Sequence, residues 1–126
     1  MSFEWSRYLT LAQELTDQAV KSSGQDTEAR LRCAISRAYF AAFGEVQNHL
    51  RKEGNFIPNT ARGHQIVVRL LKESADKTCQ KMGQLLEDLR TSRNLADYDD
   101  VVPNLLALTN GALVLAETAI SLLAKL

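Results

Sequence analysis

Residues 31–50 read LRCAISRAYFAAFGEVQNHL and form the longest helical pattern in the chain. Their apolar positions recur every three or four residues, which places them on one face of a helix: Leu31, Ile35, Ala38, Ala42 and Val46. Alanines at 34, 38, 41 and 42 would let a neighbouring backbone come close. The pattern predicts a long helix that begins near Asp26 or Thr27, both good N-caps, and continues to about Glu53.

Four further segments have helical periodicity and surround this central one. We expect helices at Ser6–Ser22, Gly63–Ser74 and Lys77–Tyr98, and a last apolar helix after Asp99 and Asp100 with Pro103 in its first turn. Residues 54–61 form the one clear loop. The sequence therefore predicts an all-α fold, an up-and-down bundle of four to five helices.

Composition limits the function classes. The chain has 126 residues, 45% hydrophobic and 24% charged, with six glycines and two prolines, which fits one helical domain over residues 1–126 and argues against a β-sandwich. The net charge of zero excludes a histone-like nucleic-acid coat. Residues 30–93 nevertheless hold twelve Lys/Arg against six Asp/Glu. That excess fits either a local site for an anionic ligand or a solvated, salt-bridged surface.

Targeting and redox features point to a cytoplasmic protein. The start of the chain lacks a secretory signal, and Cys33 and Cys79 lack metal-site spacing, so we expect free, buried thiols. The last helix is long enough to cross a membrane, but its polar residues gather towards one face, so we expect a bundle helix with part of its surface in a dimer contact. His49 and His64 are expected to have surface or capping roles.

Two segments contain the candidate site. In residues 89–99, LRTSRNLADYD, Arg93 lies four residues after Leu89 and thus on the apolar seam, with Asp97 one turn further on. A guanidinium there must be paired, open onto a cleft or face a partner, because burying it unpaired is costly. In residues 36–43, SRAYFAAF, the ring of Tyr39 can pack while its hydroxyl reaches a cleft, and Arg37 either joins the site or only covers the aromatic core.

Together these segments resemble the HEPN family (higher eukaryotes and prokaryotes nucleotide-binding), in its branch with SRAYYAAF-like and RxxADYD-like signatures. The resemblance covers essentially the whole chain, with both signatures in the family's order and separation. It implies a bundle that usually dimerises, with the late-helix motifs of two subunits lining a shared basic cleft. Many members are metal-independent ribonucleases, often toxins paired with a minimal nucleotidyltransferase antitoxin.

The resemblance also assigns residues. Arg93 and Asn94 match the start of the family's active motif, and Tyr98 stands where the motif has its histidine. The implied catalytic set is Arg93, Asn94 and Tyr98, and the implied ligand-binding set is Arg37, Tyr39, Arg90 and Asp97, with no metal and no cofactor. Histidine titrates near ~6.5 and tyrosine near ~10, so binding of RNA or a nucleotide survives this substitution better than cleavage does. In related toxins a tyrosine close to the motif can accept nucleotidyl groups from the antitoxin. By that resemblance Tyr98 is a candidate for the same modification.

Two other interpretations stay open from the sequence alone. The same bundle could be a non-catalytic module that docks a partner such as a nucleotidyltransferase, with the Arg93–Asp97 pair purely structural. A generic helical bundle could also share such alanine-rich and arginine-rich helices.

Overall fold

The helix α2 (Gly24–Lys52) is the axis of the fold, as its long apolar stripe predicts. The computed structural model describes residues 2–126 and surrounds α2 with α1 (Arg7–Ala19), α3 (Arg62–Glu73), α4 (Lys77–Tyr98) and α5 (Leu105–Leu123). Every regular element in this part of the chain is a helix. The predictions of an all-α bundle and of a loop after Glu53 are therefore confirmed.

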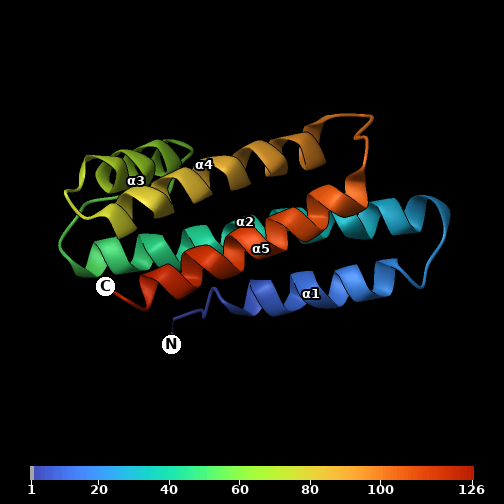
Figure 1. Ribbon diagram of the computed structural model, residues 1–126, viewed down its shortest axis with the longest axis horizontal. Coiled ribbons are helices and arrows are strands. Elements are labelled where there is room, and N and C mark those ends of the chain that lie inside the picture. Colours follow the sequence, from blue (N-terminus) through green and yellow to red (C-terminus); the bar gives the residue numbers. More distant parts are fainter. Residues whose placement is uncertain (1) are drawn as a thin grey trace.

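The helices run back and forth along one long axis (Figure 1). The α1–α2 and α4–α5 connections lie at one end of the molecule, and the two termini lie at the other end with the α2–α3 connection. The short α3 packs against α4 near this second end, where the chain approaches closely because Gly83 of α4 has no side chain. A Cβ added at Gly83 would lie 3.0 Å from Lys72 Cγ and 3.3 Å from Leu71 Cβ.

The core lies between α2 and α4 and is closed by the other helices. All five predicted stripe residues of α2 are buried, and α4 contributes Met82, Leu85, Leu86 and Leu89. Alanines 34, 38, 41 and 42 are fully buried, consistent with close helix packing. Each fully buried large aliphatic side chain stabilises the fold by roughly 1.5–3 kcal/mol, so this stripe is a main source of stability.

The predicted start of α2 is wrong by two or three residues. The helix begins at Gly24, with Ser23 as its N-cap, and Thr27 lies inside its first turns. The Thr27 hydroxyl donates instead to the carbonyl of Ala19 at 3.2 Å. It therefore satisfies the carboxyl end of α1, whose free carbonyls need hydrogen-bond donors, rather than the amino end of its own helix.

The α4–α5 connection also differs from the prediction. Pro103 lies in a turn before α5, and Asn104, in a left-handed conformation with φ of 54°, is the N-cap. The region of Asp99 and Asp100 instead closes α4: Arg32 donates to the carbonyls of Ala96 at 2.8 Å, Asp99 at 2.6 Å and Asp100 at 3.1 Å. One guanidinium from α2 thus fixes the end of α4 that carries Tyr98.

Some predicted core positions face solvent. Cys33 is free but exposed and Cys79 is free and half-buried, so the prediction of buried thiols is wrong. Cys33 lies two residues from Leu31, which turns it to the opposite side of the helix. Leu11 of α1 is 39% exposed, whereas Ala12, Thr16 and Ala19 are the buried residues of this helix.

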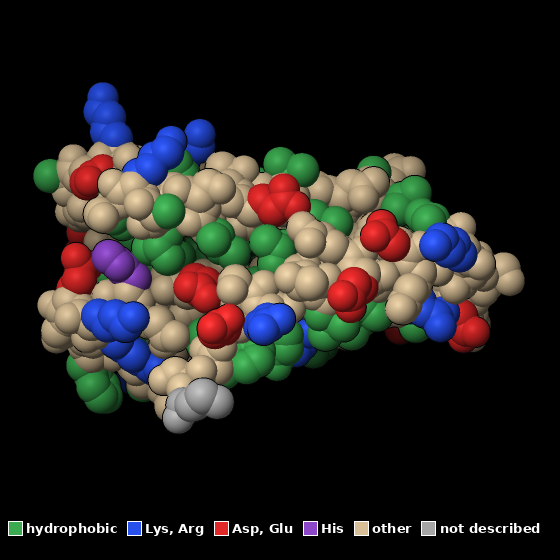
Figure 2. Space-filling view, turned by 90° about the horizontal axis from the view of Figure 1, so that it is seen from below, with side chains coloured by type: hydrophobic (Ala, Val, Ile, Leu, Met, Phe, Trp, Pro, Cys, Tyr) green, Lys and Arg blue, Asp and Glu red, His purple; other side chains and the backbone are tan. Residues whose placement is uncertain are grey.

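The last helix has one buried and one open side. Ala112, Ala116 and Ala119 are buried, whereas Leu106 and Val114 are 44% and 60% exposed. Among the helices of residues 2–126, only α5 is long and apolar enough to cross a membrane, a property that core helices of bundles share. Hydrophobic side chains also reach the surface in patches on the face seen in Figure 2.

The segment before α1 packs back onto α2. Phe3, Trp5 and Tyr8 form an aromatic cluster with ring centroids 5.0–5.8 Å apart. The Trp5 ring lies against Gly44 so closely that a Cβ at position 44 would overlap it. The backbone N–H of Ser6 donates to the Glu45 carboxylate at 3.0 Å. These contacts hold the first residues beside the middle of α2.

Candidate anion-binding groove

Two arginines on α4 form the centre of the candidate site. Arg90 and Arg93 are three residues apart and therefore neighbours on the helix surface. Arg93 Nε donates to Asp97 Oδ2 at 2.9 Å, and the two side chains are 23% and 26% exposed. The terminal nitrogens of Arg93, and the whole guanidinium of Arg90, have no hydrogen-bond partner within residues 2–126. These free N–H groups can therefore donate hydrogen bonds to an external anion.

Aromatic rings hold the Arg93 guanidinium in place. Its Cζ lies 5.3 Å from the centroid of Phe40, 5.7 Å from that of Tyr39 and 5.9 Å from that of Tyr98. The ring faces attract the cation, which makes a partly buried position tolerable. Tyr39 is buried at 3% exposure, whereas Tyr98 is 71% exposed and free to contact a ligand.

These residues line a groove of about 1150 Å³ between the end of α2, the 54–61 loop, α4 and the N-terminal segment. Its lining contains four cations: Arg51, Lys52, Arg90 and Arg93. None of the lining residues in the described chain is Asp or Glu, although Asp97 borders the groove through Arg93. Such a concentration of one charge sign in a hollow attracts anions.

Aromatic and amide groups complete the lining. The rings belong to Phe3, Trp5, Tyr39, Phe40, Phe43, His64 and Tyr98, and the side-chain amides to Gln47, Asn48, Asn59 and Asn94. Arg51 has a structural task, because it donates to the Ile57 carbonyl at 2.6 Å and to Asn59 Oδ1 at 2.7 Å and so anchors the loop. Cationic groups beside ring faces and amides are the combination that binds phosphates and bases together.

A buried polar pair lies behind the two arginines. The Tyr39 hydroxyl is 2.7 Å from His64 Nδ1, and His64 is only 7% exposed. Burial raises the pKa of Tyr39 to about 12, against the opposing effect of Arg90 and Arg93. Burial, helped by Arg90, lowers the pKa of His64 to about 4. At neutral pH a neutral phenol and the Nδ1 of a neutral imidazole therefore share one hydrogen bond, whose donor is set by the imidazole tautomer.

The prediction of a surface or capping role for His64 is wrong. The sequence offered one signal that could have located it: a buried tyrosine hydroxyl needs a hydrogen-bond partner, and the chain has two histidines. The other, His49, is half-buried and 3.4 Å from Glu53 on the same helix. His64 thus belongs to the groove although neither of the recognised segments contains it.

The structure brings most of the predicted site residues together. Arg90, Arg93, Asn94, Tyr98 and Tyr39 line the same groove.

Of the two predicted residues outside the lining, Asp97 is bonded to Arg93, and Arg37 lies apart from the site. Its guanidinium lies 4.7 Å from the Tyr8 centroid and 5.2 Å from that of Phe40, outside the groove lining. Its Nη2 donates to Ser36 at 3.3 Å, while its buried Nε lacks a partner in the described residues. The expectation that Arg37 joins the ligand site is not met, because Phe40 separates it from Arg93.

Near neutral pH the groove offers free guanidinium donors to an anion. Its one imidazole is neutral there, and Nδ1 is already occupied. Comparison with known proteins adds no assignment: no protein-family model, curated protein or solved structure matches the chain.

Proposed function

We propose that this protein binds RNA, or a nucleotide as its smallest unit, in the groove centred on Arg90 and Arg93. The observation that carries the proposal is a pair of guanidinium groups with free donors in a hollow whose lining, among residues 2–126, has no carboxylate. A guanidinium matches the geometry of a phosphate and can donate to two of its oxygens. The exposed ring of Tyr98 offers a base a stacking surface next to that phosphate.

The resemblance to the HEPN family supports the same ligand and adds a quaternary arrangement. We propose a cytoplasmic HEPN-type homodimer, with a nucleotidyltransferase antitoxin as a possible partner class. The exposed Leu106 and Val114 of α5 are consistent with burial against another protein surface. The alternative of a pure docking module predicts that the Arg93 donors are dispensable for any ligand binding.

Binding is proposed in preference to cleavage because of the proton chemistry. Metal-independent cleavage uses the RNA 2′-hydroxyl as nucleophile and needs a group that exchanges protons near neutral pH. Tyr98 occupies the position at which the family motif has its histidine. The imidazole of His64 has a pKa of about 4 and is therefore neutral at pH 7. Phosphate binding by Arg93 needs neither group to titrate.

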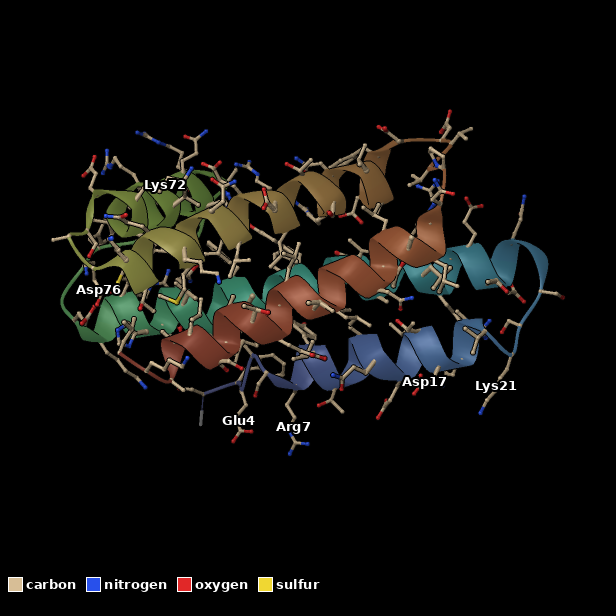
Figure 3. All side chains as sticks on the ribbon, in the orientation of Figure 1. Glu4, Arg7, Asp17, Lys21, Lys72 and Asp76 are labelled. Carbon is tan, nitrogen blue, oxygen red and sulfur yellow. The ribbon has the colours of Figure 1, made fainter. Side chains whose placement is uncertain are left out.

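The test compares wild type with Arg93→Gln in binding a fluorescently labelled single-stranded RNA across a salt series. Lys21→Gln is the matched control, since it removes one positive charge from the α1–α2 connection (Figure 3), which is not part of the groove lining. We expect Arg93→Gln to lose about tenfold in affinity and about one unit of the salt slope, with the control unchanged. Equal binding by wild type and Arg93→Gln would contradict the proposal.

A degradation assay on the same RNA, run in the presence of a chelator, tests the preference for binding. We expect intact RNA with wild-type protein at neutral pH. Degradation by wild type that disappears in Arg93→Gln would replace the binding function with a ribonuclease function at the same groove.

A further inference from the structure

A second hollow lies beside the groove, on the seam between α3 and α4. It has a volume of about 530 Å³. His64 and Arg90 line both hollows and thus form their common boundary. The new lining includes Arg69 and Lys72 from α3 and Glu87 and Thr91 from α4.

The charges in this hollow leave two guanidinium groups available. Lys72 Nζ and Glu87 Oε1 are 2.9 Å apart and neutralise each other. Glu73 remains as one carboxylate, against Arg69 and Arg90. Neither arginine has a hydrogen-bond partner in the described chain, and Arg69 is exposed at the outer side of α3. The hollow therefore has an uncompensated positive charge and free donors.

His64 adds a donor with a fixed position at the boundary. In the tautomer in which the Tyr39 hydroxyl donates to Nδ1, the imidazole proton lies on Nε2. Nε2 has no protein partner within residues 2–126, and it is not among the buried atoms that lack one, so solvent reaches it. A neutral N–H next to Arg90 suits a phosphate oxygen, which only accepts hydrogen bonds.

We propose that the α3–α4 hollow is a second phosphate subsite, so that a single RNA strand runs from the groove across His64 and Arg90 to Arg69. This inference rests on the proposed function and extends it from a mononucleotide site to a track for several linked nucleotides. Arg90 contacts the strand at the crossing, and Arg69 provides the outermost contact.

The experiment varies both the protein and the length of the RNA. An oligonucleotide of about three residues occupies the groove alone, whereas one of about twelve residues reaches both hollows. We expect Arg69→Gln to weaken the long RNA five- to tenfold and to reduce its salt slope by about one, while the short RNA binds as to wild type. Arg93→Gln should weaken both RNAs, and Lys21→Gln neither.

The outcomes separate the two proposals. If Arg93→Gln weakens binding but Arg69→Gln leaves the long RNA unaffected, the second subsite is wrong and the groove function stands. If Arg93→Gln changes neither RNA, the groove function is wrong. Tighter binding of an acidic peptide than of the long RNA, lost in Arg69→Gln, would overturn the subsite as a site for RNA.

The role of His64 is tested with two substitutions that introduce a side-chain amide, His64→Gln and His64→Asn. The Gln side chain places its N–H near the position of Nε2, whereas the shorter Asn side chain does not. Once circular dichroism shows both variants folded, we expect His64→Gln to bind the long RNA within about twofold of wild type and His64→Asn to lose several-fold. If folded His64→Asn binds the long RNA as tightly as wild type does, His64 does not contact the RNA. If neither variant folds, the Arg69→Gln measurement decides the proposal.

Discussion

The hydroxyl of Tyr39 and Nδ1 of His64 lie 2.7 Å apart, which joins the middle of α2 to the first turn of α3. The two rings also pack against Phe43, whose ring is stacked with both. The short α3 thereby gains a polar attachment to α2 in addition to its packing on α4. Because Arg90 lies near both groups and influences the pKa of each, the same pair forms the inner side of the anion-binding groove.

The lowered pKa of His64 predicts a loss of stability in mild acid. In the unfolded chain a histidine titrates near ~6.5, whereas in the fold its pKa is about 4. Between these values the unfolded state binds the proton and the folded state does not, so the free energy of unfolding falls as pH decreases from about 6.5 to about 4. The loss should reach about 3 kcal/mol.

Urea denaturation at several pH values measures this loss. His64→Gln removes the titrating group, so the difference between wild type and variant should depend on pH within that window and level off above it. Parallel stability profiles for the two proteins would show that His64 titrates normally in the fold.

Removing the Tyr39 hydroxyl should destabilise the fold at neutral pH. Tyr39→Phe keeps the buried ring but leaves His64 Nδ1 without its hydrogen-bond partner, which costs about 1–3 kcal/mol. Tyr8→Phe is the control, since Tyr8 is half-buried in an aromatic cluster and its hydroxyl forms no hydrogen bond within the described residues. The control should change the unfolding free energy by less than about 0.5 kcal/mol. Equal effects of the two substitutions in chemical denaturation would contradict a specific role of the Tyr39–His64 bond.

Asp97 is expected to weaken RNA binding in the wild-type protein. Its carboxylate accepts from Arg93 Nε at 2.9 Å and carries the only negative charge bonded to the candidate site in the described chain. Asp97→Asn removes that charge, so affinity for a single-stranded RNA should rise by roughly two- to fivefold at low salt. Asp88→Asn removes a charge from the same helix, where Asp88 accepts from Gln84, and should have a smaller effect. Weaker binding by Asp97→Asn would mean that the ion pair is needed to orient Arg93.

The architecture could be predicted because apolar spacing reports directly on burial. The α2 stripe from Leu31 to Val46 is buried throughout, and the α4 residues Met82, Leu86 and Leu89 are too. The predictions of helix ends are wrong where a side chain bonds to a neighbouring helix rather than to its own. Thr27 serves the end of α1 instead of its own helix, and Arg32 of α2 closes α4. Sequence spacing describes one helix at a time and does not show such contacts between helices.

The candidate site was predictable only in part for the same reason. Arg93 and Tyr39 each lie beside an apolar stripe, which suggested that both reach a common cleft, and they do share the groove. Arg37 fits the same local pattern, yet its guanidinium packs on the ring of Tyr8 in α1. His64 enters the groove because the 54–61 loop returns α3 towards α2, and nothing in its own neighbours indicates this.

The contact between Trp5 and Gly44 supplies a last test, because it holds the N-terminal segment that lines one side of the groove. In Gly44→Ala the new methyl group would overlap the indole, so the ring must move, at a cost of about 1–3 kcal/mol. Gly111→Ala is the matched control in a helix, since a Cβ there meets no atom within 4 Å, and it should stabilise by about 0.5–1 kcal/mol through helix propensity. Trp5 is the single tryptophan of the chain, so its fluorescence reports the displacement as a red shift in Gly44→Ala alone. If Gly44→Ala were as stable as Gly111→Ala with an unshifted spectrum, Trp5 would not rest on α2 in solution, and the groove would lack that wall.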